Sequence, residues 1–254
     1  MKCAPMEITP KVQFLGLTFD VTVMIGTLVA SLLVLLITIP AARRLALRPS
    51  GMQTVMEMVI DFLRGVLQLS FDKKSADKYI GFVVTLFLFI FFANQLGVMM
   101  MVPSEAHHPI PEWGLSGEAF ENAEGEVVWF RSPTADMNVT FAMAFAIALF
   151  AHFMGIRKHP RQYLAHYFQP FKGFVFLHII DELAKPTTHA MRLWANIFAG
   201  EVLIVIMLKA SPLLTGAPLL VWLGYSIFVG TVQAYIFTVL ATVYISQKVN
   251  IDHH

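Results

Sequence analysis

Several charged side chains interrupt an apolar stretch in the last third of the sequence, and charges in such a setting are the first candidates for chemistry. They are Asp181, Glu182, Lys185, Arg192, Glu201 and Lys209. At membrane depth each charge costs about 2.5–3.5 kcal/mol on insertion scales, so such groups are paired, hydrated or used to move ions. Arg192 is the strongest candidate, because the nearest carboxylates on its segment lie about ten residues away in either direction.

Helical geometry places these charges on two faces. At about 100° per residue, four polar side chains fall within about 40° of Arg192 around a helix: Asp181, Lys185, Thr188 and Asn196. Glu201 falls on the opposite face, so we expect it and Arg192 to have different surroundings. In an alternative interpretation, Asp181, Glu182 and Lys185 are paired or snorkelling residues near the membrane interface.

A second set of polar positions lies in the last apolar segment. Ser226 and Gln233 are seven residues apart and therefore share a helix face. Polar stripes on two neighbouring helices predict a hydrated path between them. Threonines in this segment are explained more simply by hydroxyl bonds to the carbonyl four residues earlier, and Asn94, Gln95 and His152 by hydrogen bonds between helices.

The composition indicates which elements must position these residues. Of 254 residues, 57% are hydrophobic and 14% are charged, whereas soluble domains have about 45–50% and about 25%. These values argue against a soluble enzyme and against a disordered chain. The net charge of +1 provides no electrostatic footprint for nucleic acid. The single cysteine, Cys3, allows neither an internal disulfide nor a cysteine metal cluster.

Five apolar runs reach the length of about 20 residues that a helix needs to cross a bilayer. We predict an all-α polytopic membrane protein, a single domain over residues 1–254 with spans at 21–40, 80–102, 137–156, 174–209 and 219–247. Residues 51–70 have apolar positions at helical spacing with charges opposite, which predicts an amphipathic interfacial helix. Pro212 and Pro218 predict a turn between the last two spans.

The fourth span is longer than a bilayer requires. About 36 residues extend for about 54 Å as a helix, while the hydrocarbon core is about 30 Å thick. Fitting the whole segment would need a tilt of about 56°, beyond the usual range. The segment therefore either breaks near Pro186 or lies strongly tilted, with a broad face toward a neighbour in the membrane.

Lysine and arginine predict the orientation of the chain. Most of the 18 basic residues lie after the first, third and last spans, whereas the 103–136 loop has Arg131 alone among many carboxylates. The positive-inside rule then places the N-terminus and the 103–136 loop outside and the C-terminus in the cytoplasm. The loop itself is most simply a solvated acidic surface.

The string LAKPTTHAMRLWANIFAGE at residues 183–201 resembles subunit a of the F-type ATP synthase, whose family shares an Arg-Leu-aromatic-small-Asn-x-x-Ala-Gly-Glu run. Weaker matches follow the family's order at residues 94–97, 132–138 and 232–240. Ala195 stands where glycine is common, and Trp194 where phenylalanine is usual. Ser226 stands where some members carry a histidine that works with the equivalent of Glu201.

The resemblance implies a stationary subunit in a bacterial inner (plasma) membrane, with c-ring subunits, peripheral-stalk b subunits and the rest of the F1Fo complex as partners. Two long tilted helices would contact the rotating ring, and two aqueous half-channels would carry protons to and from it. Arg192 would separate the half-channels, Glu201 would line one, and Asn196 and Gln233 would be their polar neighbours. Further lining residues would be Asp181, Glu182, Lys185, His189 and Ser226.

Other interpretations belong to different classes. The sequence has no phosphate-binding loop, so we expect no ATP chemistry on this chain. We also expect neither a cofactor nor a metal ion. Several histidines would suit an intramembrane metalloenzyme, namely His107, His108, His152, His159, His166, His178 and His189. The sequence has no His-Glu-x-x-His motif, however. A stand-alone ion channel or secondary transporter is the other alternative, but transporters often have internal repeats, and we find no convincing one.

Overall fold

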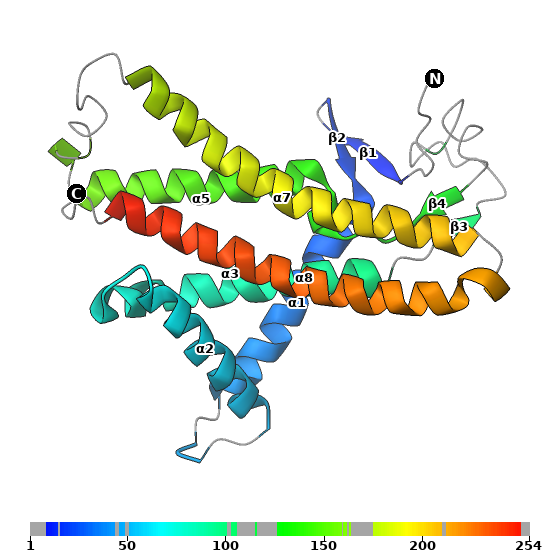
Figure 1. Ribbon diagram of the computed structural model, residues 1–254, viewed down its shortest axis with the longest axis horizontal. Helices are drawn as coiled ribbons and strands as arrows, with labels where there is room; N and C mark the ends of the chain where they lie inside the picture. The colour runs from blue at the N-terminus through cyan, green and yellow to red at the C-terminus, as the bar shows by residue number, and fades with distance from the viewer. Residues whose placement is uncertain are drawn as a thin grey trace.

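The computed structural model describes residues 9–14, 16–43, 46–48, 51–100, 103–105, 115, 126–158, 160–161, 163, 175–209 and 212–249. Long α-helices dominate this part of the chain (Figure 1), which confirms the predicted all-α fold. The helices are α1 (Val21–Arg43), α2 (Met52–Gln68), α3 (Lys73–Met100), α5 (Met137–Lys158), α7 (Val175–Lys209) and α8 (Pro212–Val249).

Five of these helices, all except α2, are long and apolar enough to cross a membrane, which confirms the predicted spans in number. A hairpin of β1 (Lys11–Phe14) and β2 (Leu17–Asp20) precedes α1 at one end of the bundle. At the opposite end, α8 finishes beside the end of α5 (Figure 1). The first and last crossings therefore begin and finish at opposite ends of the molecule.

The N-terminal hairpin leads directly into α1. Asp20 Oδ1 accepts hydrogen bonds from the Thr22 N–H at 3.0 Å and the Val23 N–H at 3.4 Å, which satisfies free amides of the first helical turn. Gly16 has φ 79° in the hairpin turn, a conformation that favours glycine. Strands of four residues carry too little alternation for the sequence to predict them.

The predicted 103–136 loop is described in part. β3 (Pro103–Glu105) pairs antiparallel with β4 (Glu126–Val128), and the short 3-10 helix η2 (Pro133–Ala135) precedes α5. Residues 106–114 and 116–125, with most of the acidic side chains of the loop, lie outside the described residues. The described part brings Arg131 and its neighbours back against the bundle.

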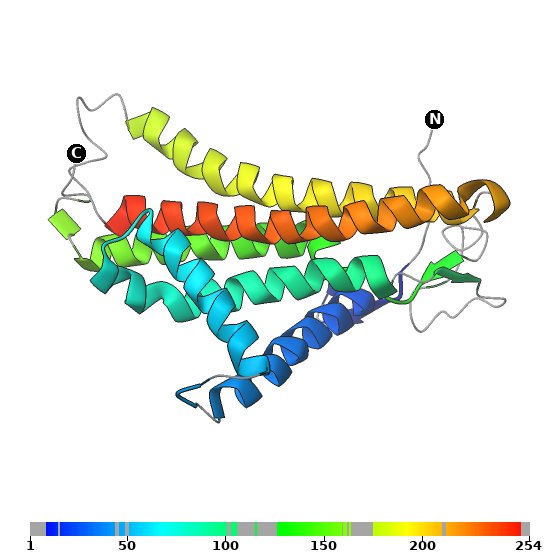
Figure 2. The same ribbon diagram turned by 60° about the horizontal axis from the view of Figure 1, so that its bottom comes forward.

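α2 is the predicted amphipathic helix, and it packs across α1 and α3 (Figure 2). Its buried side includes Met56, Leu63 and Leu67, whereas Met58 and Phe62 are exposed. Exposed apolar side chains on such a helix suit the boundary between water and lipid.

α3 begins at Lys73, earlier than the predicted start of the second span, so the last lysines of the expected basic loop are helical. Asp72 explains the early start, because its Oδ2 accepts a hydrogen bond from the Ser75 N–H at 3.3 Å. Hydrogen bonding by Ser75 lowers the pKa of the Asp72 carboxyl below its ordinary value. The cap is therefore a carboxylate at neutral pH, which also favours the helix N-terminus electrostatically.

The two longest helices differ from the sequence prediction in their details. α7 continues through Pro186, so the predicted alternative of a break there is wrong, and the helix diverges from α8 toward its start (Figure 2). α8 begins at Pro212 and includes Pro218, so the predicted turn over these prolines is wrong. Pro212 is the first residue of the helix, where its missing N–H would have no partner anyway.

The core lies among α3, α5, α7 and α8, where Phe237, Leu193 and Ile90 are fully buried. The predicted hydrogen bonds between helices are present, because the side-chain amides of Asn94 and Gln95 donate to the carbonyls of Gly230 and Ile227 at 2.9 and 3.1 Å. Threonines of α8 donate to the carbonyl four residues earlier, as expected. These contacts fix α3 against α8.

Candidate functional site

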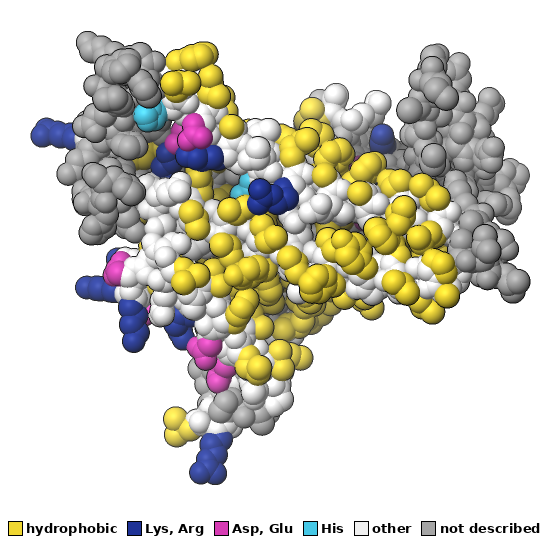
Figure 3. All heavy atoms as spheres, viewed as in Figure 1, with side chains coloured by type: hydrophobic (Ala, Val, Ile, Leu, Met, Phe, Trp, Pro, Cys, Tyr) yellow, Lys and Arg dark blue, Asp and Glu magenta, His cyan; other side chains and the backbone are white. Residues whose placement is uncertain are grey.

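Arg192 lies on the exposed side of α7, together with Asp181, Thr188 and Asn196, whereas Glu201 is buried. The exposure pattern agrees with the two faces that helical geometry predicts. In Figure 3, hydrophobic side chains cover the surface over α7 and α8, and a basic group with a histidine beside it lies among them. None of the ion pairs between described residues includes Arg192.

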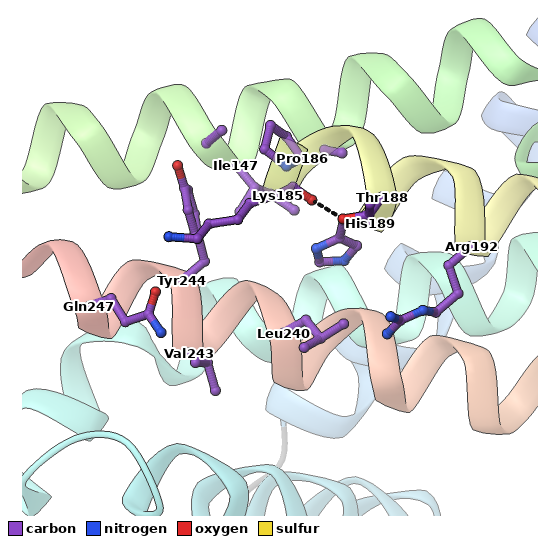
Figure 4. Close-up of a pocket in the computed structure, with 12 residues that line it drawn as sticks. Ile147, Lys185, Pro186, Thr188, His189, Arg192, Leu240, Val243, Tyr244 and Gln247 are labelled. Carbon is purple, nitrogen blue, oxygen red and sulfur yellow. Dashed lines mark hydrogen bonds between the residues drawn. The ribbon is translucent and has the colours of Figure 1, made fainter. Parts of the chain in front are cut away.

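A cavity of about 210 Å³ opens beside Arg192, between α5, α7 and α8. Its polar lining also includes Lys185, Thr188, His189, Tyr244 and Gln247. Arg192 reaches from α7 toward α8, and the His189 ring lies between it and Lys185 (Figure 4). The His189 ring contacts Phe237 at a centroid distance of 3.9 Å, and its buried Nε2 has no hydrogen-bond partner in the described part of the chain.

Asn196 and Gln233 connect α7 to α8 one helical turn beyond Arg192. The Asn196 Nδ2 donates to the Gln233 Oε1 at 2.9 Å. Gln233 is only 3% exposed, and its Nε2 has no hydrogen-bond partner among the described residues. Asn196 therefore orients the Gln233 amide and leaves its Nε2 as a donor for a further partner.

Glu182 is the centre of a buried polar cluster at the end of the bundle where α8 finishes, which we call the α8-end cluster. Lys248 forms an ion pair with its carboxylate, and the Tyr244 hydroxyl donates to it at 2.5 Å. His152 of α5 places its Nε2 3.4 Å from the same carboxylate and its Nδ1 2.8 Å from the Tyr163 hydroxyl. Such pairing offsets the cost of removing these charges from water.

Asp181 and Lys185 also pair, at 2.6 Å and one turn apart on the exposed face. The alternative interpretation of residues 181, 182 and 185 as paired groups is therefore correct in its geometry. The pair of Asp181 and Lys185 is largely exposed and contributes little to stability. The buried pair of Glu182 and Lys248 has the larger effect on how α7 and α8 meet.

Glu201 is the centre of a second cluster, which we call the hairpin-end cluster because it lies toward the β-hairpin. Its Oε2 is 3.4 Å from the Arg131 Nε, and its Oε1 accepts a hydrogen bond from the Ser132 N–H at 3.2 Å. Gly97 of α3 allows this approach, since a Cβ there would lie 2.6 Å from the Glu201 Oε1. Ser226 is buried nearby, across from Gly200, and its hydroxyl has no partner in the described chain.

The two clusters lie at different levels of α7, with Arg192 between them. Glu182 precedes Arg192 by ten residues and Glu201 follows it by nine, which correspond to about 15 and about 13 Å along a helix. The two carboxylates are thus about 28 Å apart along the helix axis, and a strong tilt of the helix makes their difference in depth smaller than that. Arg192 lies about midway between them along α7.

The structure distributes the predicted site residues over the cavity beside Arg192 and the two clusters, and several of their contacts were missed by the sequence analysis. Lys248, Tyr244 and Tyr163 complete the α8-end cluster, and Arg131 and Ser132 complete the hairpin-end cluster. The signal for Arg131 was its isolation as the one basic residue of an acidic loop. The described residues hold no group of three or more metal-ligand side chains, and His107, His108, His159 and His166 lie outside them.

These features define an integral, multi-pass helical membrane protein with ionisable groups inside its candidate spans, an arrangement typical of proteins that move ions. The chain belongs to the ATP synthase A chain family, whose model matches residues 23–246. Among curated relatives named ATP synthase subunit a, the protein from Priestia megaterium is 35% identical over 254 residues, 96% of this chain and 98% of the relative. The protein from Bacillus subtilis is 33% identical, over 95% of this chain and 97% of the relative.

Proposed function

We propose that this chain is the stationary subunit a in the Fo sector of a bacterial F-type ATP synthase. It forms two aqueous half-channels that pass protons to and from a rotating ring of c subunits, and it thereby couples the ion gradient to ATP synthesis or hydrolysis. The observation that carries the proposal is the arrangement along α7, in which one carboxylate cluster precedes Arg192, another follows it, and a cavity opens beside the arginine.

The chemistry of arginine suits the central position. A guanidinium stays protonated at any physiological pH, so Arg192 does not relay a proton itself. Its fixed positive charge favours the ionised form of a ring carboxyl that comes opposite it, and that carboxyl therefore releases its proton before it passes. The same charge repels cations, which prevents protons from moving directly between the half-channels.

The clusters are suitable ends for the two half-channels. The α8-end cluster, with Glu182, adjoins the cavity beside Arg192 through Tyr244 and would open to the cytoplasm. The hairpin-end cluster, with Glu201, would open to the outside, in accord with the orientation that the basic residues predict. Asn196 and Gln233 would provide polar groups at the level where α7 and α8 contact the ring.

The exposed side of α7 and α8 supplies a surface for the ring. Large apolar side chains are exposed along both helices, among them Leu183, Met191, Ile227 and Phe228. Ring carboxyls would travel neutral through lipid and become ionised only beside Arg192. A charge that crosses the membrane gains about 2.3 kcal/mol per 100 mV, and the offset of the two half-channels would turn this energy into rotation. The b subunits and the catalytic sector complete the complex, where ATP chemistry occurs.

The test is ATP-driven proton pumping by the assembled complex in liposomes, with wild-type and Arg192→Ala chains. We expect Arg192→Ala to abolish the pH gradient while the soluble sector still hydrolyses ATP, and passive proton leak to increase. Arg157→Ala, at the end of α5, is the matched control and should pump normally. Unchanged pumping by Arg192→Ala would refute the role of this arginine, and ion transport by the purified chain alone would favour a stand-alone channel or transporter.

A further inference from the structure

Both oxygens of the Glu201 carboxylate are held by two consecutive residues of the segment before α5. Arg131 lies 3.4 Å from one oxygen, and the Ser132 N–H donates to the other at 3.2 Å. This segment and Glu201 are 70 residues apart in sequence. A contact from so far along the chain fixes the carboxylate from outside its own helix.

The segment that holds Glu201 is itself anchored. The Ser132 hydroxyl donates to the Ala93 carbonyl at 2.8 Å, and the Thr134 hydroxyl donates to the Asn94 Oδ1 at 2.6 Å. Asn94 in turn bonds the Gly230 carbonyl of α8. The Arg131 backbone is therefore tied to α3 and, through it, to α8.

Arg131 stands between Glu201 and a large cavity of about 1410 Å³. This cavity is bounded by the β-hairpin, α1, α7 and the start of α5, and Arg131 contributes to its wall. The Arg131 side chain is 24% exposed, whereas Glu201 is 3% exposed. The guanidinium also lies over the Phe198 ring, 5.5 Å from its centroid. An ion in the cavity meets Arg131 before it meets Glu201.

Neighbouring helices bring uncharged residues of the described chain close to Glu201. α3 presents Gly97, and α8 presents the neutral Ser226 beyond Gly200. Charged side chains elsewhere on the cavity wall are Lys11, Asp20 and Asp136. The two aspartates are engaged locally, since Asp20 caps α1 and Asp136 accepts the Asn138 N–H at 2.8 Å.

We propose that Arg131 is a positioning residue for proton transfer through Glu201: its guanidinium, on the wall of the outer cavity, holds the carboxylate ionised and oriented to receive a proton. Arg131 thus provides the basic partner at a site where Ser226 cannot titrate. The proton arrives from the cavity, binds the Glu201 carboxylate and moves on to the ring carboxyl. Arg131 keeps its own protons throughout. This inference rests on the proposed function of the chain.

The test measures ATP synthesis by the reconstituted complex as a function of external pH at constant driving force. In Arg131→Gln the carboxylate loses its opposite charge, so the external pH of half-maximal rate should rise by about one unit, the lower end of the effect of one charge at this range. Arg131→Lys keeps the charge and should restore the wild-type pH dependence. Lys11→Gln removes a positive charge from the same cavity wall and should change nothing.

The possible outcomes are distinct. A lower rate with an unshifted pH dependence in Arg131→Gln would mean that Arg131 only supports the fold, and would overturn the proposal. The same shift in Lys11→Gln would attribute it to the general field of the cavity and would also overturn it. Arg192→Ala in the same preparation separates the two claims, because its loss of synthesis supports the proposed function whatever the Arg131 variants do.

Discussion

Gly97 sets how closely the Arg131 segment can approach α3 and α7. A Cβ at this position would lie 2.5 Å from the Ser132 Cβ and 2.6 Å from the Glu201 Oε1. Real Cβ atoms do not come so close, and the Ser132 Cβ cannot move without its backbone. The glycine is therefore required by its neighbours from two other segments and not by its own helix.

We predict that Gly97→Ala destabilises the protein by about 1–3 kcal/mol, the usual cost of overpacking, and lowers proton transfer because Glu201 is displaced. Gly81→Ala is the matched control on the same helix, because a Cβ there meets nothing within 4 Å. It should be neutral or stabilising by up to about 1 kcal/mol. Thermal unfolding in detergent measures both effects, and equal stability of the two variants would contradict the packing argument.

The sequence correctly predicts that Arg192 and Glu201 lie on opposite faces of one helix, because their relative position on that helix is a local property. The angle between them follows from the helical repeat alone. The partners of Glu201 are different, since nothing local to residue 201 points to Arg131. A pair formed across 70 residues depends on how α3, α5 and α7 pack together, and a single sequence does not encode that contact in any periodic form.

At the scale of elements, the end of α8 is fastened to α7 by the ion pair of Lys248 and Glu182. The side chains are 9% and 13% exposed, so each charge depends on the other. α7 diverges from α8 toward its start (Figure 2), which leaves this pair and Tyr244 as polar contacts between the helices near that end.

We predict that Lys248→Met destabilises the protein by about 3–5 kcal/mol, because removing one partner leaves a buried charge without its counterion. The double variant Glu182→Gln with Lys248→Met should recover most of this loss. A double-mutant cycle by thermal unfolding gives the coupling energy. Strictly additive effects would show that the two side chains do not interact.

The existence of the helices was predictable, and their ends were only partly so. Apolar length determines a membrane span directly, and all five spans follow from it. The starts of α3 and α8 depend on Asp72 and Pro212, which act through capping and through φ preferences over a few atoms. The continuity of α7 through Pro186 depends on its surroundings, because neighbouring helices can support a helix at a proline.

At the scale of the whole molecule, a crossing by α1 would place the β-hairpin and the α1–α2 connection on opposite sides of the membrane. Leu17 in β2 and Leu47 before α2 are both strongly exposed, at 63% and 105%. In a Cys3→Ser background, we predict that Leu17→Cys reacts with an impermeant maleimide from outside intact cells, and that Leu47→Cys reacts only in inverted vesicles. The reverse pattern would overturn the orientation.

The spacing of the two clusters along α7 has an electrical consequence. If water carries the potential of each side inward to Glu182 and Glu201, those levels become nearly equipotential with their respective solutions. At the tilt of about 56° that the length of α7 would require, about 28 Å along its axis corresponds to about 16 Å of depth. The membrane voltage would then fall over about half of the bilayer, and the field around Arg192 would be roughly twice that of the same voltage over about 30 Å. The bundle would concentrate the field, and the arginine would stand where the force on a passing charge is greatest.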